Sequence, residues 1–329
     1  MKALVLTEQP EIVLQDIEKP TLEAGKVLVK MKAVALNRRD QWIRVGLYPG
    51  MTYGCTLGAD GCGIVEEIGE GVAASWLGQE VVINPNNHWG SSQAHQSAQY
   101  HILGMPSNGT FAEYLLIGAD RLQPKPAHLS TEEAAALPLA GLTAYRALFT
   151  RGELKAGQKV LVTGIGGGVA QFAAQFALAA GAEVYVSSGD DAKIEKMKSL
   201  GIAGGANYRR EGWHKELLKS SGGFDLVIDS AGGKDFNLLL RTLQPAGTVV
   251  FYGATLGPAP VDMPRVFFGQ HTIKGSTMGS DEEFVEMLAF VAKYQIKPVL
   301  DSVRPFEQIV EAVNDMRDSK IFGKVVLHF

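Results

Sequence analysis

KVLVTGIGGGVAQFAAQFALAAGAEVYVSS, residues 159–188, is the stretch that decides the fold. Residues 160–163 and 183–187 predict two short strands, and the glycines of 164–168 predict a tight turn after the first of them. A strand that enters a glycine turn and a helix within about 30 residues is typical of the βαβ unit that binds a dinucleotide. Glycines let the backbone approach a phosphate closely, and the positive end of the helix attracts its charge. The stretch therefore predicts a dinucleotide-binding domain.

The segment between the two strands predicts an amphipathic helix. Its apolar residues recur at helical spacing, and they are Val169, Phe172, Ala173, Phe176, Ala177 and Ala180. This spacing places Gln171 and Gln175 on the opposite face, and Gly181 stands where a helix C-terminus favours positive φ. Read as G-x-G-x-x-G/A, the turn Gly164–Ala170 allows several registers, so a plain glycine-rich turn is the alternative to a phosphate site.

Length and composition narrow the class of protein. A chain of 329 residues has room for two domains, and 46% hydrophobic with 20% charged residues is ordinary for a globular protein. The net charge of −4 and the absence of a long basic run argue against nucleic acid as a partner. No stretch has the length and apolarity of a membrane span, and the N-terminus predicts a strand rather than a signal peptide, so we expect a cytoplasmic protein. Cys55 and Cys62 form no CxxC motif and are expected to be small buried residues.

The order of predicted elements divides the chain. Short β-like runs separated by Gly, Pro and Asn fill residues 1 to about 120 and predict an antiparallel β-rich domain. Strands at 225–229, 248–252 and 272–275 alternate with helices after the fingerprint, which fits a doubly wound parallel sheet. The last predicted strand, 324–327, is expected to pair back into the first domain.

The segment Asn84–Asn108 is polar and predicts a long surface lobe. It contains His88, His95 and His101 but no cysteine or nearby acidic partner, so solvated histidines are favoured over a metal site.

Dispersed motifs in a fixed order resemble the medium-chain dehydrogenase/reductases, and among them the zinc-free, quinone oxidoreductase-like branch. The resemblance covers nearly the whole chain. Its motifs are Met1-Lys2-Ala3, Asn37-Arg38-Arg39-Asp40, Arg44-x-Gly46-x-Tyr48, Gly58-x-Asp60-Gly61-x-Gly63, Gly109–Tyr114, Leu137–Ala144, the glycine turn, Asn207-Tyr208, Gly275-Ser276 and Gly323–Leu327. It implies a GroES-like β-rich domain, residues 1–122 and 296–329, interrupted by a Rossmann dinucleotide-binding domain, residues 123–295. The active site would lie in the cleft between the domains.

The resemblance also indicates where a metal would be held. Zinc-containing members have a cysteine where this chain has Asn37, a His-Glu pair where it has Ala59-Asp60, and a second cysteine where it has Leu139. Zinc requires about four ligands in fixed geometry, and the thiols of the family's structural site are missing from the 84–108 lobe as well. We therefore expect no metal.

Without a Lewis acid, the negative charge that develops during hydride transfer must be stabilised by hydrogen-bond donors. Quinones and α,β-unsaturated carbonyls need the least help, because they delocalise the incoming charge. The catalytic candidates are Asn37, whose amide is a donor, and Tyr48, whose phenol is another; Arg38 and Arg44 are weaker candidates. A turn role for Asn37 and a packing role for Tyr48 are the alternatives.

The expected cofactor is NADPH rather than NADH. The position that would carry a ribose-binding acid is Ser188, although Asp190 and Asp191 follow closely. By resemblance, Lys193 and Tyr208 contact the 2′-phosphate and Arg209 adds charge. By the same resemblance the remaining cofactor contacts are Thr143, Gly164, Gly166, Gly167, Gly168, Val169, Gly253, Ala254, Ser276, Thr277, Met278 and Lys324.

The leading hypothesis is an NADPH-dependent, zinc-independent reductase of quinones or activated alkenes, acting on a small-molecule substrate. The resemblance implies a homodimer joined through edge strands near 248–276. An alcohol dehydrogenase and a non-catalytic NADP(H)-binding protein remain the alternatives.

Overall fold

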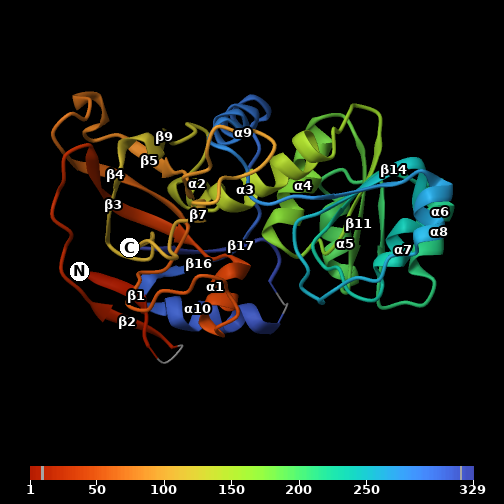
Figure 1. The fold of residues 1–329 in the computed structure, drawn as a ribbon, viewed down its shortest axis with the longest axis horizontal. Coiled ribbons are helices and arrows are strands. Elements are labelled where there is room, and N and C mark those ends of the chain that lie inside the picture. The colour runs from red at the N-terminus through yellow and green to blue at the C-terminus, as the bar shows by residue number, and fades with distance from the viewer. Residues whose placement is uncertain (9–10, 319–320) are drawn as a thin grey trace. The chain divides into compact units, whose positions relative to one another are not determined.

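The computed structural model describes residues 1–8, 11–318 and 321–329 (Figure 1). The chain divides into two compact units. Unit 1 comprises Met1–Ala140 and Ser280–Phe329, and unit 2 comprises Gly141–Gly279. A GroES-like β-rich part and a Rossmann-type parallel sheet are therefore both present, as the sequence predicts.

Unit 2 is built on a parallel sheet of six strands in the order β12-β11-β10-β13-β14-β15. In chain order the strands are β10 (Lys159–Val162), β11 (Glu183–Ser188), β12 (Gly204–Asn207), β13 (Phe224–Asp229), β14 (Leu243–Phe251) and β15 (Thr272–Gly275). The first strand, β10, pairs with both β11 and β13, so the strand order reverses at this point. Ligands of doubly wound sheets bind at such a reversal, beyond the carboxyl ends of the strands.

Helices connect these strands. They are α4 (Gly168–Ala179), α5 (Asp191–Lys198), α6 (Trp213–Ser221), α7 (Phe236–Leu240) and α8 (Met263–Gly269), whereas α3 (Pro138–Tyr145) and the π-helical turn η3 (Arg146–Arg151) precede β10. The predicted strand, turn, helix and strand of the fingerprint are confirmed as β10, α4 and β11. One detail was wrong: Gln171 is buried, because its side chain donates to the carbonyl of Ile165 at 2.7 Å and so supports the glycine turn from below.

Unit 1 contains a seven-stranded sheet, mostly antiparallel, in the order β16-β17-β3-β4-β5-β9, with β8 also paired to β3. Its strands are β3 (Lys26–Ala35), β4 (Asp60–Ile68), β5 (Glu80–Ile83), β8 (Tyr114–Gly118), β9 (Leu122–Pro124), β16 (Leu300–Pro305) and β17 (Lys324–His328). The predicted return of the C-terminal strand is confirmed, since β17 pairs antiparallel with β3.

The other elements of unit 1 surround this sheet. The small strand pairs are β1 (Lys2–Leu6) with β2 (Ile12–Asp16) and β6 (Asn86–Asn87) with β7 (His101–Ile102). The helices are α1 (Arg38–Arg44), α2 (Thr131–Ala135), α9 (Asp281–Tyr294) and α10 (Ile309–Asp315), with short 3₁₀ turns η1 (Ala74–Trp76), η2 (Ala119–Arg121), η4 (Phe306–Gln308) and η5 (Met316–Asp318).

Several of these elements carry weak sequence signals. Strand β12 reads GGAN and has no β-forming residue, yet it pairs with β11 in register. A Cβ on Gly205 would lie 2.8 Å from a methyl group of Ile194, so glycine is required where α5 crosses the strand closely. Strand β8 begins at Tyr114, and α7 ends at Leu240, three residues before β14 starts.

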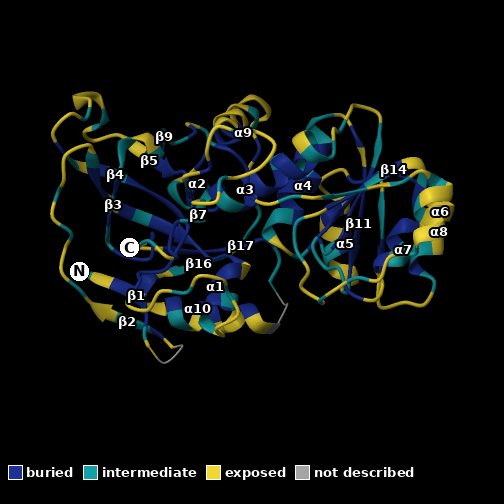
Figure 2. Ribbon diagram, in the orientation of Figure 1, coloured by how far each residue is buried: buried dark blue, intermediate teal, exposed yellow. Residues whose placement is uncertain are grey.

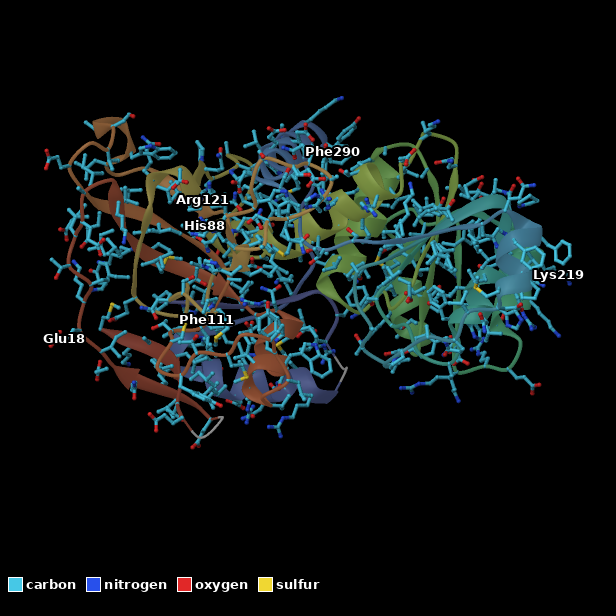
Figure 3. The ribbon with its side chains drawn as sticks, in the orientation of Figure 1. Glu18, His88, Phe111, Arg121, Lys219 and Phe290 are labelled. Carbon is cyan, nitrogen blue, oxygen red and sulfur yellow. The ribbon has the colours of Figure 1, made fainter. Side chains whose placement is uncertain are left out.

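The units divide at Ala140 and Ser280, whereas the resemblance implied boundaries at 122/123 and 295/296. Specific contacts hold the intervening segments in unit 1. Arg121, labelled in Figure 3, forms a 2.8 Å ion pair with Asp281 at the start of α9. The His128 ring contacts the Ile296 carbonyl at 3.0 Å.

The 84–108 lobe is only partly a surface feature. Its middle is mostly exposed, but Trp89, Leu103 and Met105 are buried and anchor it to unit 1. The rings of His88 and His101 lie 5.5 Å apart. No group of three or more His, Cys, Asp or Glu residues suited to a metal occurs in residues 1–8, 11–318 and 321–329.

Each unit has its own apolar core (Figure 2). Unit 1 packs Leu4, Val29, Phe111 and Leu327 in its interior, and unit 2 packs Leu161, Phe224 and Val249. Cys55 and Cys62 are buried free thiols, as expected, and burial raises their pKa to about 11 and about 12. No helix in the described part of the chain is long and apolar enough to cross a bilayer.

Gly109→Ala tests the close backbone contact beneath Phe111. A Cβ at Gly109 would lie 2.0 Å from the carbonyl oxygen of Gly58. This oxygen belongs to the backbone and cannot move aside as a flexible side chain can. We expect a loss of about 3 kcal/mol in the free energy of unfolding, at the upper end for overpacked sites. Urea unfolding followed by tryptophan fluorescence measures this loss.

The control for that experiment is Gly78→Ala, which places alanine at positive φ but in open space. Its cost should be only about 1–2 kcal/mol, the ordinary penalty for a left-handed alanine. Equal losses in the two variants would contradict the contact.

Candidate functional site

The positions that the family resemblance links to a metal converge on one ammonium group in unit 1. Lys324 Nζ, on β17, donates to Asn37 Oδ1 at 2.7 Å, to Asp60 Oδ2 at 2.9 Å and to the Leu36 carbonyl at 2.7 Å. Lys324 is 3% exposed and Asp60 is fully buried. The ion pair is therefore desolvated, and all three ammonium hydrogens are used within unit 1.

Asp60 is the acceptor that ties this network together. Its Oδ2 accepts from Asn37 Nδ2 as well as from Lys324, both at 2.9 Å. Its Oδ1 accepts from the Leu139 backbone N–H at 2.7 Å. The carbonyl of Asp60 accepts from Thr110 Oγ1 at 2.8 Å. Both oxygens of this buried carboxylate therefore accept hydrogen bonds.

These contacts fix the orientation of the Asn37 amide. An ammonium can only donate and a carboxylate can only accept, so Oδ1 must face Lys324 and Nδ2 must face Asp60. One Nδ2 hydrogen is used on Asp60, and the second has no acceptor in the part of the chain that the structure describes. Because the ammonium draws electrons from the amide oxygen, this remaining N–H is a stronger donor than that of a free amide.

The same geometry tests whether a metal fits. A divalent ion at the Asn37 and Asp60 oxygens would meet the Lys324 ammonium at hydrogen-bond distance from the same atoms. Like charges so close in a desolvated site repel strongly. Leu139 adds no ligand, so the residues present do not fit a zinc ion.

Tyr48 forms no hydrogen bond with Asn37 in the part of the chain that the structure describes. It is half-buried, and its hydroxyl accepts from Arg39 Nε at 3.3 Å. The weaker candidates have structural partners: Arg38 Nη1 donates to the Met316 carbonyl at 2.9 Å, and Arg44 bonds Asn314.

Helix α1 also carries two buried charged residues to which sequence reasoning gave no role. Arg39 is 7% exposed and Asp40 is 1% exposed. Asp40 Oδ2 accepts from the Asn37 backbone N–H at 2.7 Å, which closes the first turn of the helix. Burial raises the pKa of Asp40 to about 6, against the opposing charges of Arg39 and Lys324. The signal in the sequence was the run Arg38-Arg39-Asp40 directly after Asn37, which places charged residues on the face that α1 buries.

In unit 2 the predicted cofactor residues gather at one edge of the parallel sheet. Each group follows the carboxyl end of a strand: the glycine turn follows β10, Ser188 ends β11, Tyr208 follows β12, Gly253-Ala254 follow β14 and Ser276-Thr277-Met278 follow β15. Thr143, on α3, donates to the Met278 sulfur at 3.6 Å. Lys324 is not among this group, because it is engaged in unit 1.

The glycine turn has the form that a phosphate site requires. Gly164 has φ +63°, and a Cβ there would face the Ser230 hydroxyl at 3.7 Å across the strand reversal. Helix α4 begins at Gly168, and its first-turn N–H groups are free of intrahelical partners. The carboxylate of Asp229 accepts from Thr163 at 2.6 Å and from Gly232 N at 2.9 Å, which holds the two loops at the reversal.

The end of β11 has basic rather than acidic surroundings. A Cβ on Gly189 would lie 2.7 Å from the Tyr208 hydroxyl and 2.9 Å from Arg209 Nε. The nearby acids are already used: Asp190 caps α5 through Ala192 N at 2.9 Å, and Asp191 pairs with Arg210 at 2.7 Å. The Tyr208 hydroxyl and the Arg209 guanidinium therefore lie directly against Gly189 at the end of β11.

Two family profiles match the chain, the one described as alcohol dehydrogenase GroES-like domain over residues 23–127 and the one described as zinc-binding dehydrogenase over 168–293. The zinc-type alcohol dehydrogenase-like protein YogA of Leptosphaeria maculans is 36% identical, covering 95% of this chain and 93% of the relative. An alcohol dehydrogenase of Geobacillus stearothermophilus is 30% identical over 99% of both chains. A crystal structure of an NAD-dependent alcohol dehydrogenase superposes with a TM-score of 0.94 at 35% identity, covering 100% of both chains.

Asp40→Asn tests the raised pKa in α1. Because the folded protein binds the Asp40 proton more tightly than the unfolded chain does, the stabilisation is complete below pH 3.8 and is lost as the pH rises through about 6. Asparagine keeps an acceptor for the Asn37 N–H and removes the charge. We compare the free energy of unfolding of the variant with that of the wild type. From pH 4 to pH 7, we expect this difference to shift in favour of the variant by up to about 3 kcal/mol, in proportion to the pKa difference.

Urea unfolding at several pH values between these limits measures the gain. Glu18→Gln, at an exposed position labelled in Figure 3, is the control and should track the wild type. A difference between Asp40→Asn and the wild type that does not change with pH would contradict the assignment.

Proposed function

Since the chain belongs to the medium-chain dehydrogenase/reductase superfamily, we propose that it is a zinc-independent, NADPH-dependent reductase of quinones or α,β-unsaturated carbonyls. The observation that carries the proposal is the Lys324 ammonium held between Asn37 and Asp60. This internal cation stands at the positions that hold a metal in zinc-containing members. It leaves Asn37 as the group that meets the substrate oxygen.

The chemistry assigned to unit 1 is charge stabilisation. The free N–H of Asn37 donates to the carbonyl oxygen, and the bond strengthens as that oxygen becomes an enolate or hydroquinone anion. The reduced nicotinamide supplies the hydride. One amide donor offers less stabilisation than a metal ion, which favours acceptors that delocalise the charge over saturated ketones.

Unit 2 carries the cofactor in this proposal. The glycine turn and the start of α4 hold the pyrophosphate, and Ser188, Tyr208 and Arg209 hold the 2′-phosphate. The Arg209 side chain has no ion-pair partner in the described residues, which leaves its charge for the phosphate. One similar structure is named as an NAD-dependent alcohol dehydrogenase, and this name argues against a preference for NADPH. NADH is therefore the cofactor to compare with NADPH.

The names of the relatives favour a second candidate, an alcohol dehydrogenase. That activity commonly depends on a Lewis acid to polarise a saturated carbonyl. Lys324 occupies the position that a metal ion would need, which weighs against this activity here.

The two buried free thiols fit a reducing compartment, and we propose the cytoplasm as the place of action.

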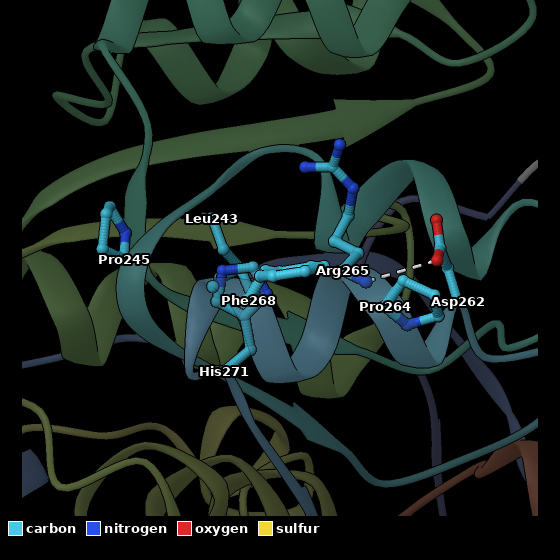
Figure 4. A pocket seen from close by; sticks show the side chains of 8 residues that line it. Leu243, Pro245, Asp262, Pro264, Arg265, Phe268 and His271 are labelled. Carbon is cyan, nitrogen blue, oxygen red and sulfur yellow. Dashed lines mark hydrogen bonds between the residues drawn. The ribbon is translucent and has the colours of Figure 1, made fainter.

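We also propose that unit 2 forms the interface of a homodimer. Strand β15 ends the sheet, and no described strand pairs with its outer edge. Helix α8 beside it exposes Met263, Phe267 and Phe268 at 63%, 61% and 80%. A groove of about 470 Å³ runs along the helix past Arg265 and His271 (Figure 4). Unpaired edges beside large exposed apolar side chains are typical of interfaces.

The proposed reaction is tested by NADPH oxidation with a benzoquinone and with a simple enone, beside NADH and after dialysis against a chelator. We expect turnover that prefers NADPH and survives the chelator. Asn37→Ala should lower kcat by about 100-fold or more, as loss of a transition-state donor does. Asn314→Ala, an exposed asparagine outside the network, is the control and should retain activity.

Each other outcome has a distinct meaning. Turnover that the chelator abolishes would show that a metal participates. NADPH binding without turnover on either acceptor would favour a non-catalytic protein. Arg209→Ser should reduce the preference for NADPH over NADH, and an unchanged preference would remove Arg209 from the cofactor site.

Phe268→Glu tests the dimer. The wild type should sediment as a dimer, and a carboxylate at the centre of the apolar patch should convert it to a monomer. Tyr294→Glu, which adds the same charge at an exposed aromatic residue of α9, should remain dimeric. A monomeric wild type, or a Phe268→Glu variant that stays dimeric, would overturn this proposal.

A further inference from the structure

Arg39 is a buried cation that lacks an ion-pair partner. Its side chain leaves α1 into the interior of unit 1, where the residue is 7% exposed. Nη1 donates to the Leu103 carbonyl at 2.7 Å, and the guanidinium carbon lies 4.8 Å from the centre of the Tyr48 ring. Among the residues that the structure describes, no carboxylate lies within ion-pair distance of it. Buried arginines are almost always paired, so this charge requires an explanation.

The unused donors of Arg39 and Tyr48 lie side by side. Nη2 has no hydrogen-bond partner, although it is closed off from water. Nε on the same edge of the guanidinium donates to the Tyr48 hydroxyl at 3.3 Å, so the hydroxyl acts as acceptor there. Its own hydrogen finds no acceptor in the described residues. Two donor groups beside a positive charge form a site for an anion, and the Nε–Nη2 edge matches the two oxygens of a carboxylate.

The adjacent acid does not fill this role. Asp40 lies near enough for the Arg39 charge to act on it, but its Oδ2 accepts from the Asn37 N–H at 2.7 Å. Its Oδ1 has no hydrogen-bond partner, so no hydrogen bond joins it to the guanidinium. The Nη2 hydrogens of Arg39 therefore remain available to a ligand.

The Tyr48 ring covers one side of the guanidinium. The residues around it, 45–54, are mostly exposed. Gly46, Gly50 and Gly54 in this segment have positive φ, and a Cβ at any of them would meet nothing within 4 Å. Tyr48 and Met51 of this segment pack against the core of unit 1, so the Tyr48 hydroxyl is held beside Arg39 as part of the anion site.

We propose that Arg39 and Tyr48 bind a carboxylate of the substrate, and that the protein acts on α,β-unsaturated carbonyl compounds that carry an acid group. The inference rests on the proposed function, because it names the substrate class of the same site. Asn37 and Arg39 belong to the start of one helix, two residues apart. The amide would meet the carbonyl oxygen that gains charge, and the guanidinium would hold the acid and orient the alkene.

The kinetic test uses 3-benzoylacrylate and its methyl ester, which differ only in the acid group. With NADPH as donor, the wild type should have a kcat/KM at least about 10-fold higher for the acid, the worth of one charged hydrogen bond. Most of this difference should lie in KM. Arg39→Met should remove the preference by lowering kcat/KM much more for the acid than for the ester, and Arg39→Lys should retain part of the preference.

Two variants make the result specific to the site. Lys30→Met removes one positive charge from an exposed position of β3 and should keep the preference for the acid. Tyr48→Phe removes only the hydroxyl donor and should weaken the preference without removing the arginine. Thermal unfolding of each variant shows whether it folds. Equal kcat/KM for acid and ester in the wild type, or an equal loss on both in Arg39→Met, would overturn the proposal.

Calorimetry separates this proposal from the proposed function. The saturated product, 3-benzoylpropionate, is titrated into the full-length protein with NADP⁺, and its methyl ester is titrated in parallel. Binding of the acid that Arg39→Met abolishes supports the carboxylate site even if neither alkene is turned over, in which case only the reductase function fails. If the acid does not bind more tightly than the ester, the carboxylate site is wrong whatever the turnover.

Discussion

The Lys324 ammonium is the interaction on which unit 1 depends. It joins three segments that are far apart in the chain, since Asn37 and Asp60 precede Lys324 by 287 and 264 residues. Placing an ion pair in a dry interior is costly, and removing one partner leaves the other charge uncompensated. The pair persists because Leu36, Leu139 and Asn37 satisfy the remaining hydrogen-bonding positions. Its consequence for chemistry is that the Asn37 amide has only one orientation.

In our proposal, this arrangement lets a fold that commonly holds zinc act without a metal. A metal provides a positive charge and a fixed direction for the substrate oxygen. Here the positive charge belongs to a side chain that cannot leave and cannot itself reach a substrate, because its three hydrogens are occupied. The directional contact passes to the neighbouring amide. A weaker electrophile restricts the acceptors, and in our proposal Arg39 narrows them further to those that carry an acid.

Sequence reasoning was most successful where local rules and the tertiary fold agree. The strand, glycine turn, helix and strand of residues 159–188 were predicted within a residue or two, because periodicity and glycine act over short distances. It failed at β12, whose GGAN sequence becomes a strand only because β11 pairs with it. It also misplaced Gln171, since helical spacing cannot show that a carbonyl of the preceding turn needs a donor.

The sequence by itself determined the fold class, the glycine turn with its helix, and the absence of the usual thiol and imidazole ligands at Asn37, Ala59 and Leu139. The first two follow from residue type and spacing along the chain, and the third follows from the resemblance to the medium-chain dehydrogenase/reductases. Only the tertiary structure decided that Lys324 meets Asn37 and Asp60, and that Arg39 is buried without a partner carboxylate. Pairing of buried charges depends on distances between segments that local pattern does not encode. The chemical character of the site therefore depends on the pairing of β17 with β3, which local sequence pattern does not specify.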